Sequence, residues 1–96
     1  MTRYVLSPRA QADMEGIWDY TAERWNSVQA ERYVRALQEA IETIAADPLR
    51  ARPCDHIRAG YRKYSFGSHV IFFRAAASGI DIVRILHQRM DFERHL

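Results

Sequence analysis

The sequence has a single cysteine and lacks any long apolar run. Cys54 cannot form an internal disulfide, which favours a reducing compartment. No apolar run approaches the ~20 residues that a membrane span requires, and residues 1–8 are too short and too polar for a secretory signal. We therefore expect a cytoplasmic protein with no membrane association.

Ligands for a metal or a cofactor are equally scarce. Cys54 lies in a polar stretch without further ligands nearby, and we interpret it as a plain loop thiol. The histidines at positions 56, 69, 87 and 95 show no ligand spacing. We therefore expect no metal site and no cofactor.

Lysine is almost absent. Thirteen of the fourteen basic residues are arginine, and the remaining one is Lys63. Residues 1–47 carry five arginines and eight acidic residues, a net charge of −3, whereas residues 48–96 carry nine basic and four acidic residues, a net charge of +5. The planar fork of arginine suits carboxylate or phosphate. The basic half indicates an anionic partner such as an acidic peptide, RNA or a DNA-bound enzyme, and a solvated basic surface is the alternative.

What is present is the composition of one ordinary globular domain. The chain has 96 residues, of which 48% are hydrophobic and 27% charged. We expect a single domain over residues 1–96 with a modest core, so that part of its stability depends on a partner.

The N-terminal half predicts a short strand and a helical hairpin. Residues 3–6 are typical of a strand, and Ser7-Pro8 is a helix start. Apolar residues at steps of three and four predict helices over residues 8–25 and 28–47, with Trp18, Trp25 and Tyr33 in the core. The break near Asn26 is so short that the helices must be antiparallel neighbours.

The C-terminal half predicts an antiparallel meander. Residues 48–60 form a loop, residues 61–66, 69–74 and 80–87 form strands, and residues 88–96 are a short polar tail. The near-continuous apolar run of the last strand indicates a central strand covered on both faces. The order strand-helix-helix-strand-strand-strand predicts an α+β fold, a helical hairpin packed on a small antiparallel sheet.

Several local strings, taken in this order, resemble the RelE/ParE toxin superfamily and its ParE branch in particular. The strings cover nearly the whole chain: Leu6-Ser7-Pro8 with Ala10 and Asp13, Ile17-Trp18-Asp19-Tyr20, Gly60-Tyr61-Arg62, His69-Val70-Ile71-Phe72-Phe73-Arg74, and Ile82-Val83-Arg84-Ile85-Leu86-His87 with Met90-Asp91. The resemblance implies the toxin of a type II toxin–antitoxin system, in hetero-oligomeric complex with a ParD-like antitoxin whose C-terminal segment wraps it.

The two branches of the superfamily imply different modes of action. ParE-like toxins poison DNA gyrase by binding, whereas RelE-like toxins cleave messenger RNA on the ribosome. A third alternative is a relic that binds its antitoxin but is no longer toxic. The sequence resembles the branch that acts on gyrase, so we expect no sequence-specific binding of nucleic acid by the toxin alone.

Catalytic residues for RNA cleavage look incomplete. Cleavage needs a base, an acid and cations around the phosphate, and Lys63, Arg74, Arg84, His87 and Arg89 form no specific motif. Val70 is apolar where some nuclease relatives place arginine, Phe92 has no hydroxyl, and His95 lies at the very end of the tail. We therefore expect a protein that is not an enzyme and has no catalytic residue.

Two sets of residues are candidates for partner binding. Arg62, Arg74 and Arg84 lie on the three meander strands and would seat an acidic antitoxin, unless they only form ion pairs with Asp81 or helix carboxylates. Tyr20 lies off the apolar stripe and would anchor the antitoxin, whose amphipathic helix suits a groove between hairpin and sheet.

The second set is the segment after the last strand. His87, Arg89, Met90, Asp91 and Phe92 are exposed and polar in the main, and we expect them to contact the target. The alternative for His87 is a hydrogen-bonded histidine that orients the tail.

Overall fold

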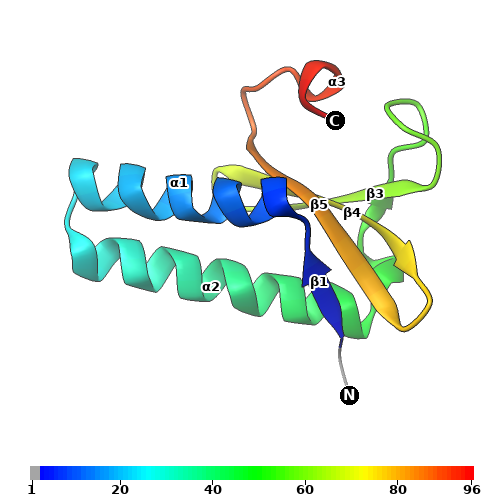
Figure 1. The fold of residues 1–96 in the computed structure, drawn as a ribbon, viewed down its shortest axis with the longest axis horizontal. Helices are drawn as coiled ribbons and strands as arrows, with labels where there is room; N and C mark the ends of the chain where they lie inside the picture. The colour runs from blue at the N-terminus through cyan, green and yellow to red at the C-terminus, as the bar shows by residue number, and fades with distance from the viewer. Residues whose placement is uncertain (1–2) are drawn as a thin grey trace.

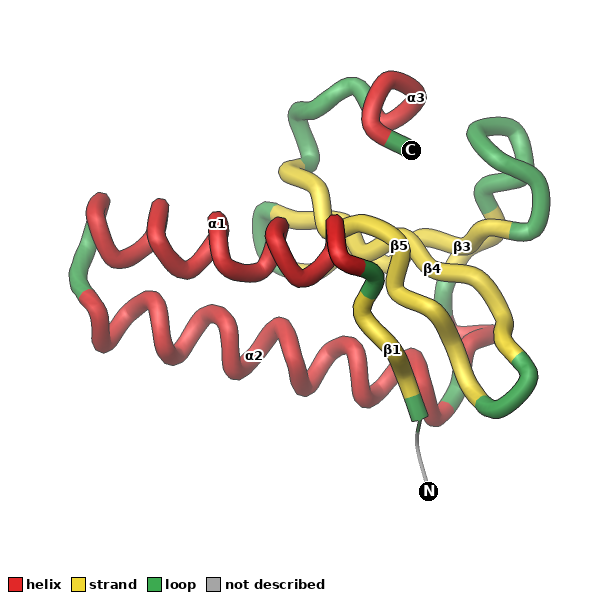
Figure 2. The backbone as a smooth tube through the Cα atoms, viewed as in Figure 1, coloured by secondary structure: helices red, strands yellow, loops and turns green. Residues whose placement is uncertain are grey.

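The structure is a computed structural model that describes residues 3–96. A helical hairpin lies against one face of a five-stranded sheet, and the chain ends in a short helix (Figures 1 and 2). In chain order the elements are β1 (Tyr4–Leu6), α1 (Pro8–Arg24), α2 (Ser27–Ala46), a 3-10 turn (Pro48–Arg50), β2 (Arg52–Pro53), β3 (Tyr61–Phe66), β4 (His69–Ala76), β5 (Gly79–His87) and α3 (Phe92–His95). The predicted α+β class is confirmed, and the predicted strands and helices occur in the predicted order, with β2 and α3 in addition.

The sheet has the strand order β1-β5-β4-β3-β2. Strands β3, β4 and β5 form the predicted antiparallel meander, and β5 is an interior strand. The prediction of a purely antiparallel sheet is wrong at β1, which runs parallel to β5 because the helical hairpin carries the chain back before the meander begins. The prediction of a plain loop over residues 48–60 is also wrong in part, since β2 pairs with β3 there.

Both long helices begin at side-chain caps. The Ser7 hydroxyl accepts a hydrogen bond from the Ala10 N–H at 3.0 Å, and the Asn26 side-chain oxygen accepts one from the Gln29 N–H at 2.8 Å. Each cap satisfies a helix N–H that has no partner within the helix. The helix bounds therefore lie within one residue of those predicted.

The sheet is buried on both faces. The inner core lies between sheet and hairpin and includes Leu37, Ile41 and Phe73. An outer core of Cys54, Val70, Phe72 and Leu86 lies on the opposite face, covered in part by Phe92 and Leu96. Figure 2 shows the tail folding back over the sheet on the side away from α2. Cys54 lies in the loop after β2 as a free thiol, but its side chain is fully buried.

The end of the hairpin carries an exposed tryptophan. The prediction that Trp25 belongs to the core is wrong, because it caps the C-terminus of α1 and is 69% exposed. That end of the hairpin projects beyond the sheet (Figure 1). Trp18 is half-buried, and Tyr33 packs against the inner core. Among residues 3–96, no helix is both long and apolar enough to cross a bilayer.

The inner core is expected to supply most of the stability. Leu37→Ala should lower the free energy of unfolding by about 2–5 kcal/mol, because it leaves a cavity in a fully buried site. Leu49 is 77% exposed, and the same substitution there should change stability by less than about 0.5 kcal/mol. Urea denaturation of both variants measures the difference, and equal losses would contradict this placement of the core.

Candidate functional site

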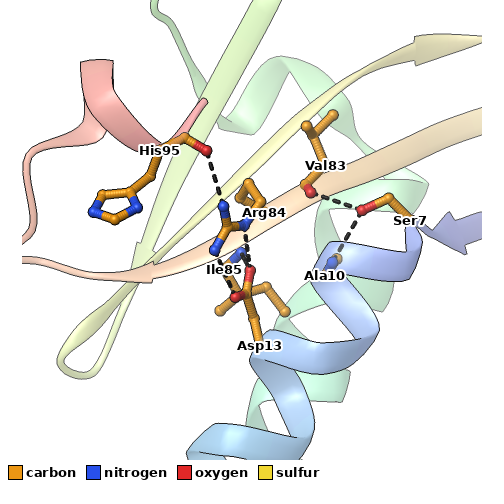
Figure 3. A network of polar contacts seen from close by, with 7 residues as sticks. All are labelled: Ser7, Ala10, Asp13, Val83, Arg84, Ile85 and His95. Carbon is orange, nitrogen blue, oxygen red and sulfur yellow. Dashed lines mark hydrogen bonds and ion pairs between the residues drawn. The ribbon is translucent and has the colours of Figure 1, made fainter.

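The free edge of β5 is completed by side chains of α1. Strand β1 pairs only with Ile80, Asp81 and Ile82, which leaves the rest of that edge without a neighbouring strand. The Ser7 hydroxyl donates to the Val83 carbonyl at 2.7 Å, and the Ile85 N–H donates to the Asp13 carboxylate at 2.9 Å (Figure 3). Buried backbone groups need such partners. The edge contacts thus fix the position of α1 on the sheet.

Arg84 joins this edge to the tail. Its Nε and Nη2 donate to the two carboxylate oxygens of Asp13, each at 2.8 Å, and its Nη1 donates to the His95 carbonyl at 2.9 Å (Figure 3). The two side chains are only 15% and 14% exposed. The hydrogen bonds that Arg84 donates to Asp13 raise the pKa of Arg84. A bidentate ion pair of this kind is among the stronger polar contacts in proteins. Together with the bond to the His95 carbonyl, it links α1, β5 and α3.

A groove lies beside this pair, between the helical hairpin and the adjoining ends of β4 and β5. It has a volume of about 1040 Å³ and a mainly apolar lining that is open to solvent. Tyr20, Trp25 and Met90 line it and are 63%, 69% and 37% exposed. Large apolar side chains gathered in one exposed hollow are typical of a site for a protein or peptide partner.

Gly16 opens the floor of the groove. It lies inside α1, where glycine costs up to about 1 kcal/mol relative to alanine. A Cβ placed at Gly16 would meet no atom within 4 Å, so packing within the chain does not require glycine here. The missing side chain leaves helix backbone accessible from the groove.

A polar cluster closes the end of the groove at the β3–β4 turn. The Ser68 N–H donates to the Tyr33 hydroxyl at 3.2 Å, and the Tyr33 hydroxyl lies 2.7 Å from His69 Nδ1. Which of the two groups donates in the second contact depends on the tautomer of His69. Burial lowers the pKa of His69, the neighbouring His87 lowers it further, and Asp13 opposes both.

The predicted antitoxin-binding residues do not form one cluster. Tyr20 is exposed in the groove, whereas Arg84 is held by Asp13. Arg62 donates to the Ala51 carbonyl at 2.9 Å. Arg62 pairs in register with Phe73, the residue before Arg74, so the side chains of Arg62 and Arg74 point to opposite faces of the sheet.

Arg74 lies in register with Asp81, near the turn at the end of β4. Its Nε is 3.6 Å from the Asp81 carboxylate, and its side chain is 56% exposed. A contact of this length and exposure contributes little to stability. Arg74 is therefore the most accessible of the three predicted arginines.

The predicted target-binding segment divides between groove and outer core. His87 and Met90 line the groove, and the Arg89 N–H donates to His87 Nδ1 at 3.1 Å, so His87 does orient the turn into the tail. Asp91 caps α3 by accepting from the Glu93 N–H. The Phe92 ring packs on Phe72 with 4.9 Å between ring centroids and is half-buried.

Two features of the site were not predicted from the sequence: Trp25 was assigned to the core, and Gly16 was given no role in a groove. The ion pair of Arg84 with Asp13 matches the alternative named for the arginines, an ion pair with a helix carboxylate, although Asp13 itself was noted only as part of a string. A glycine inside a strongly amphipathic helix was the available signal for Gly16. Among residues 3–96, no three histidine, cysteine or acidic side chains are placed to hold a metal ion together.

Comparisons with known proteins agree over most of the chain. A family model described as "ParE toxin of type II toxin-antitoxin system, parDE" matches residues 4–92. Toxin ParE1 of Mycobacterium tuberculosis is 57% identical over 96 residues, which is 99% of this chain and 98% of that protein. Toxin ParE1 of Caulobacter vibrioides is 46% identical over 96 residues, 100% of this chain and 99% of that protein.

A solved structure shares the fold. The structure titled "Chromosomal ParDE TA system from P. aeruginosa" has a TM-score of 0.80 against this chain, covering 91% of it and 96% of the other chain. The two sequences are 21% identical, so the likeness concerns the fold alone.

The polar cluster predicts loss of stability in mild acid. The pKa of His69 lies below its usual value of 6.5 only in the folded chain, so the unfolded chain binds more protons as the pH falls through that value. The free energy of unfolding should therefore decrease between about pH 7.5 and pH 5.5. Urea denaturation across this range measures the decrease.

Two variants test the source of this pH dependence. His69→Asn removes the titrating group and should reduce the decrease. His56→Gln, at an exposed loop position, should show the same decrease in the free energy of unfolding as the unaltered protein. If both variants show the same pH dependence as the unaltered protein, His69 is not the source.

Proposed function

The chain belongs to the ParE toxin family of type II toxin–antitoxin systems, and on this premise we propose that it is neutralised by a ParD-like antitoxin and poisons DNA gyrase by binding, without catalysis. Both partners act in the cytoplasm, where we place the toxin. The apolar groove beside the helical hairpin is the observation that carries the proposal.

An amphipathic antitoxin helix fits this groove. Its apolar face would cover Tyr20, Trp25 and Met90, which are exposed to solvent in the groove. Burying apolar surface of this kind is the main driving force of helix-in-groove binding. Arg24 and Arg32 also line the groove, so acidic side chains flanking the apolar face of the antitoxin helix would find cations there.

Binding in the groove would also block the target surface. His87 and Met90 belong to the segment that we expect to contact gyrase, and both line the groove. An antitoxin bound there would cover part of that segment. Neutralisation then requires only that two partners compete for one surface.

The placement of the candidate nuclease residues favours binding over RNA cleavage. His87 pairs in register with His69 on the face that carries the hairpin, whereas Lys63 pairs with Phe72 of the outer core and so lies on the other face. Arg84 is already bound to Asp13. A general acid or base must lie within reach of the same phosphate as its cations, and these residues are separated by the sheet.

The groove can be blocked without disturbing the fold. Gly16→Arg places a long side chain into it, where a Cβ has open space, and should weaken binding of the ParD-like antitoxin at least tenfold, about 1.4 kcal/mol. Gly16→Ala adds only a methyl group and should keep the affinity while raising helix stability by up to about 1 kcal/mol. Titration calorimetry compares the two, and equal affinities would place the antitoxin elsewhere.

The choice of target is tested with purified DNA gyrase. The toxin should inhibit supercoiling, and prior mixing with antitoxin should restore it. Met90→Glu should weaken inhibition at least about tenfold, because it puts a charge into the contact. Leu49→Glu, at an exposed position outside the groove, should not.

Other outcomes identify the alternatives. Unaffected gyrase together with cleavage of ribosome-bound message would assign the RelE-like activity. Expression that leaves growth unchanged would identify a relic that only binds antitoxin.

A further inference from the structure

Two cations lie directly opposite each other at the edge of the sheet. Arg52 of β2 pairs in register with Lys63 of β3, and Lys63 pairs with Phe72 of the outer core. Directly opposed residues of antiparallel strands share a face, with Cβ atoms about 4.5–5.5 Å apart. Both side chains therefore stand on the outer face, which does not carry the hairpin.

Nothing in the described chain neutralises this pair. Among residues 3–96, neither Arg52 nor Lys63 makes an ion pair or a side-chain hydrogen bond. The nearest acidic residue in sequence, Asp55, accepts from the Gly60 N–H at 2.8 Å. Like charges opposed across two strands are destabilising. Because no carboxylate of the described chain offsets this repulsion, an anion from another molecule would relieve it.

The surroundings extend the positive charge. Arg50 is exposed two residues before Arg52. Arg58 donates to the backbone carbonyl of Leu96, which places its guanidinium beside the outer core. The outer edge of the sheet thus has several cations spread over neighbouring segments rather than one isolated charge.

The aromatic residues of the outer face favour a duplex over a single strand. Single-stranded nucleic acid is held by cations together with free rings on which bases stack. Here Phe72 is fully buried, Phe92 packs on it, and Tyr61 packs against the outer core. With these rings buried or partly buried, the face can still contact the closely spaced phosphates of duplex DNA, which need only cations.

We propose that Arg52 and Lys63 bind the phosphate backbone of duplex DNA, without reading its sequence. The contact lies on the face of the sheet opposite the helical hairpin, which forms one side of the antitoxin groove. It goes beyond the proposed action on gyrase, since it is a property of the toxin alone and is measured without gyrase.

The test compares two variants that lose the same charge. Arg52→Gln/Lys63→Gln removes the pair, and Arg9→Gln/Arg35→Gln removes two exposed cations from the helical hairpin. Fluorescence anisotropy with a labelled duplex of about 20 base pairs follows binding from about 50 to 200 mM salt. The pair variant should bind at least about tenfold more weakly than the hairpin variant, with a salt dependence shallower by about two phosphate contacts.

Several results would overturn the proposal. These are absent binding of duplex by the unaltered toxin at the lowest salt, equal losses in both variants, or preference for a single-stranded RNA of the same length. A pair variant that loses affinity for the antitoxin but not for DNA would assign the two cations to an acidic protein.

Urea denaturation shows whether the pair variant is still folded. Removing opposed like charges should raise the urea midpoint of the pair variant above that of the unaltered toxin. A lower midpoint would show that a carboxylate does neutralise the pair, which also contradicts the proposal.

Discussion

The contacts along the free edge of β5 determine how the rest of the molecule is arranged. Strand β1 is three residues long, so the backbone of β5 beyond Ile82 would be left unpaired. Ser7 and Asp13 supply the missing hydrogen-bond partners from the first turns of α1. Asp13 in turn orients Arg84, which holds the tail. One short strand thus accounts for the position of the hairpin, the groove beside it and the return of the tail.

The groove follows from this arrangement because the end of the hairpin where α1 meets α2 extends past the sheet (Figure 1). Tyr20 and Trp25 lie toward that end of α1, and both are exposed. The antitoxin and the target are both expected at this unfilled corner. The basic edge formed by Arg52 and Lys63 lies on the other face, so the molecule has two separate surfaces, one apolar and one cationic.

Local patterns predicted the elements well, and contacts between distant residues account for the rest. Helical periodicity placed both long helices to within one residue, and turn residues placed the meander. The pair of Arg84 and Asp13 joins residues 71 positions apart, which no local pattern encodes. Trp25 fits a helical stripe, but the stripe continues past the end of the sheet that buries it. The tail is polar in composition, yet its apolar residues Phe92 and Leu96 pack onto the outer core.

The burial of Cys54 has a chemical consequence for the folded toxin. The thiol is fully covered, and burial raises its pKa although the charge of Lys63 opposes this. Oxidants and alkylating agents attack exposed thiolates, so Cys54 is protected as long as Phe92 and Leu96 cover its surroundings. Because it is the only cysteine in the chain, two toxin molecules cannot become covalently cross-linked through sulfur unless both of them first open. The small outer core therefore keeps the Cys54 thiol unreactive in the folded protein.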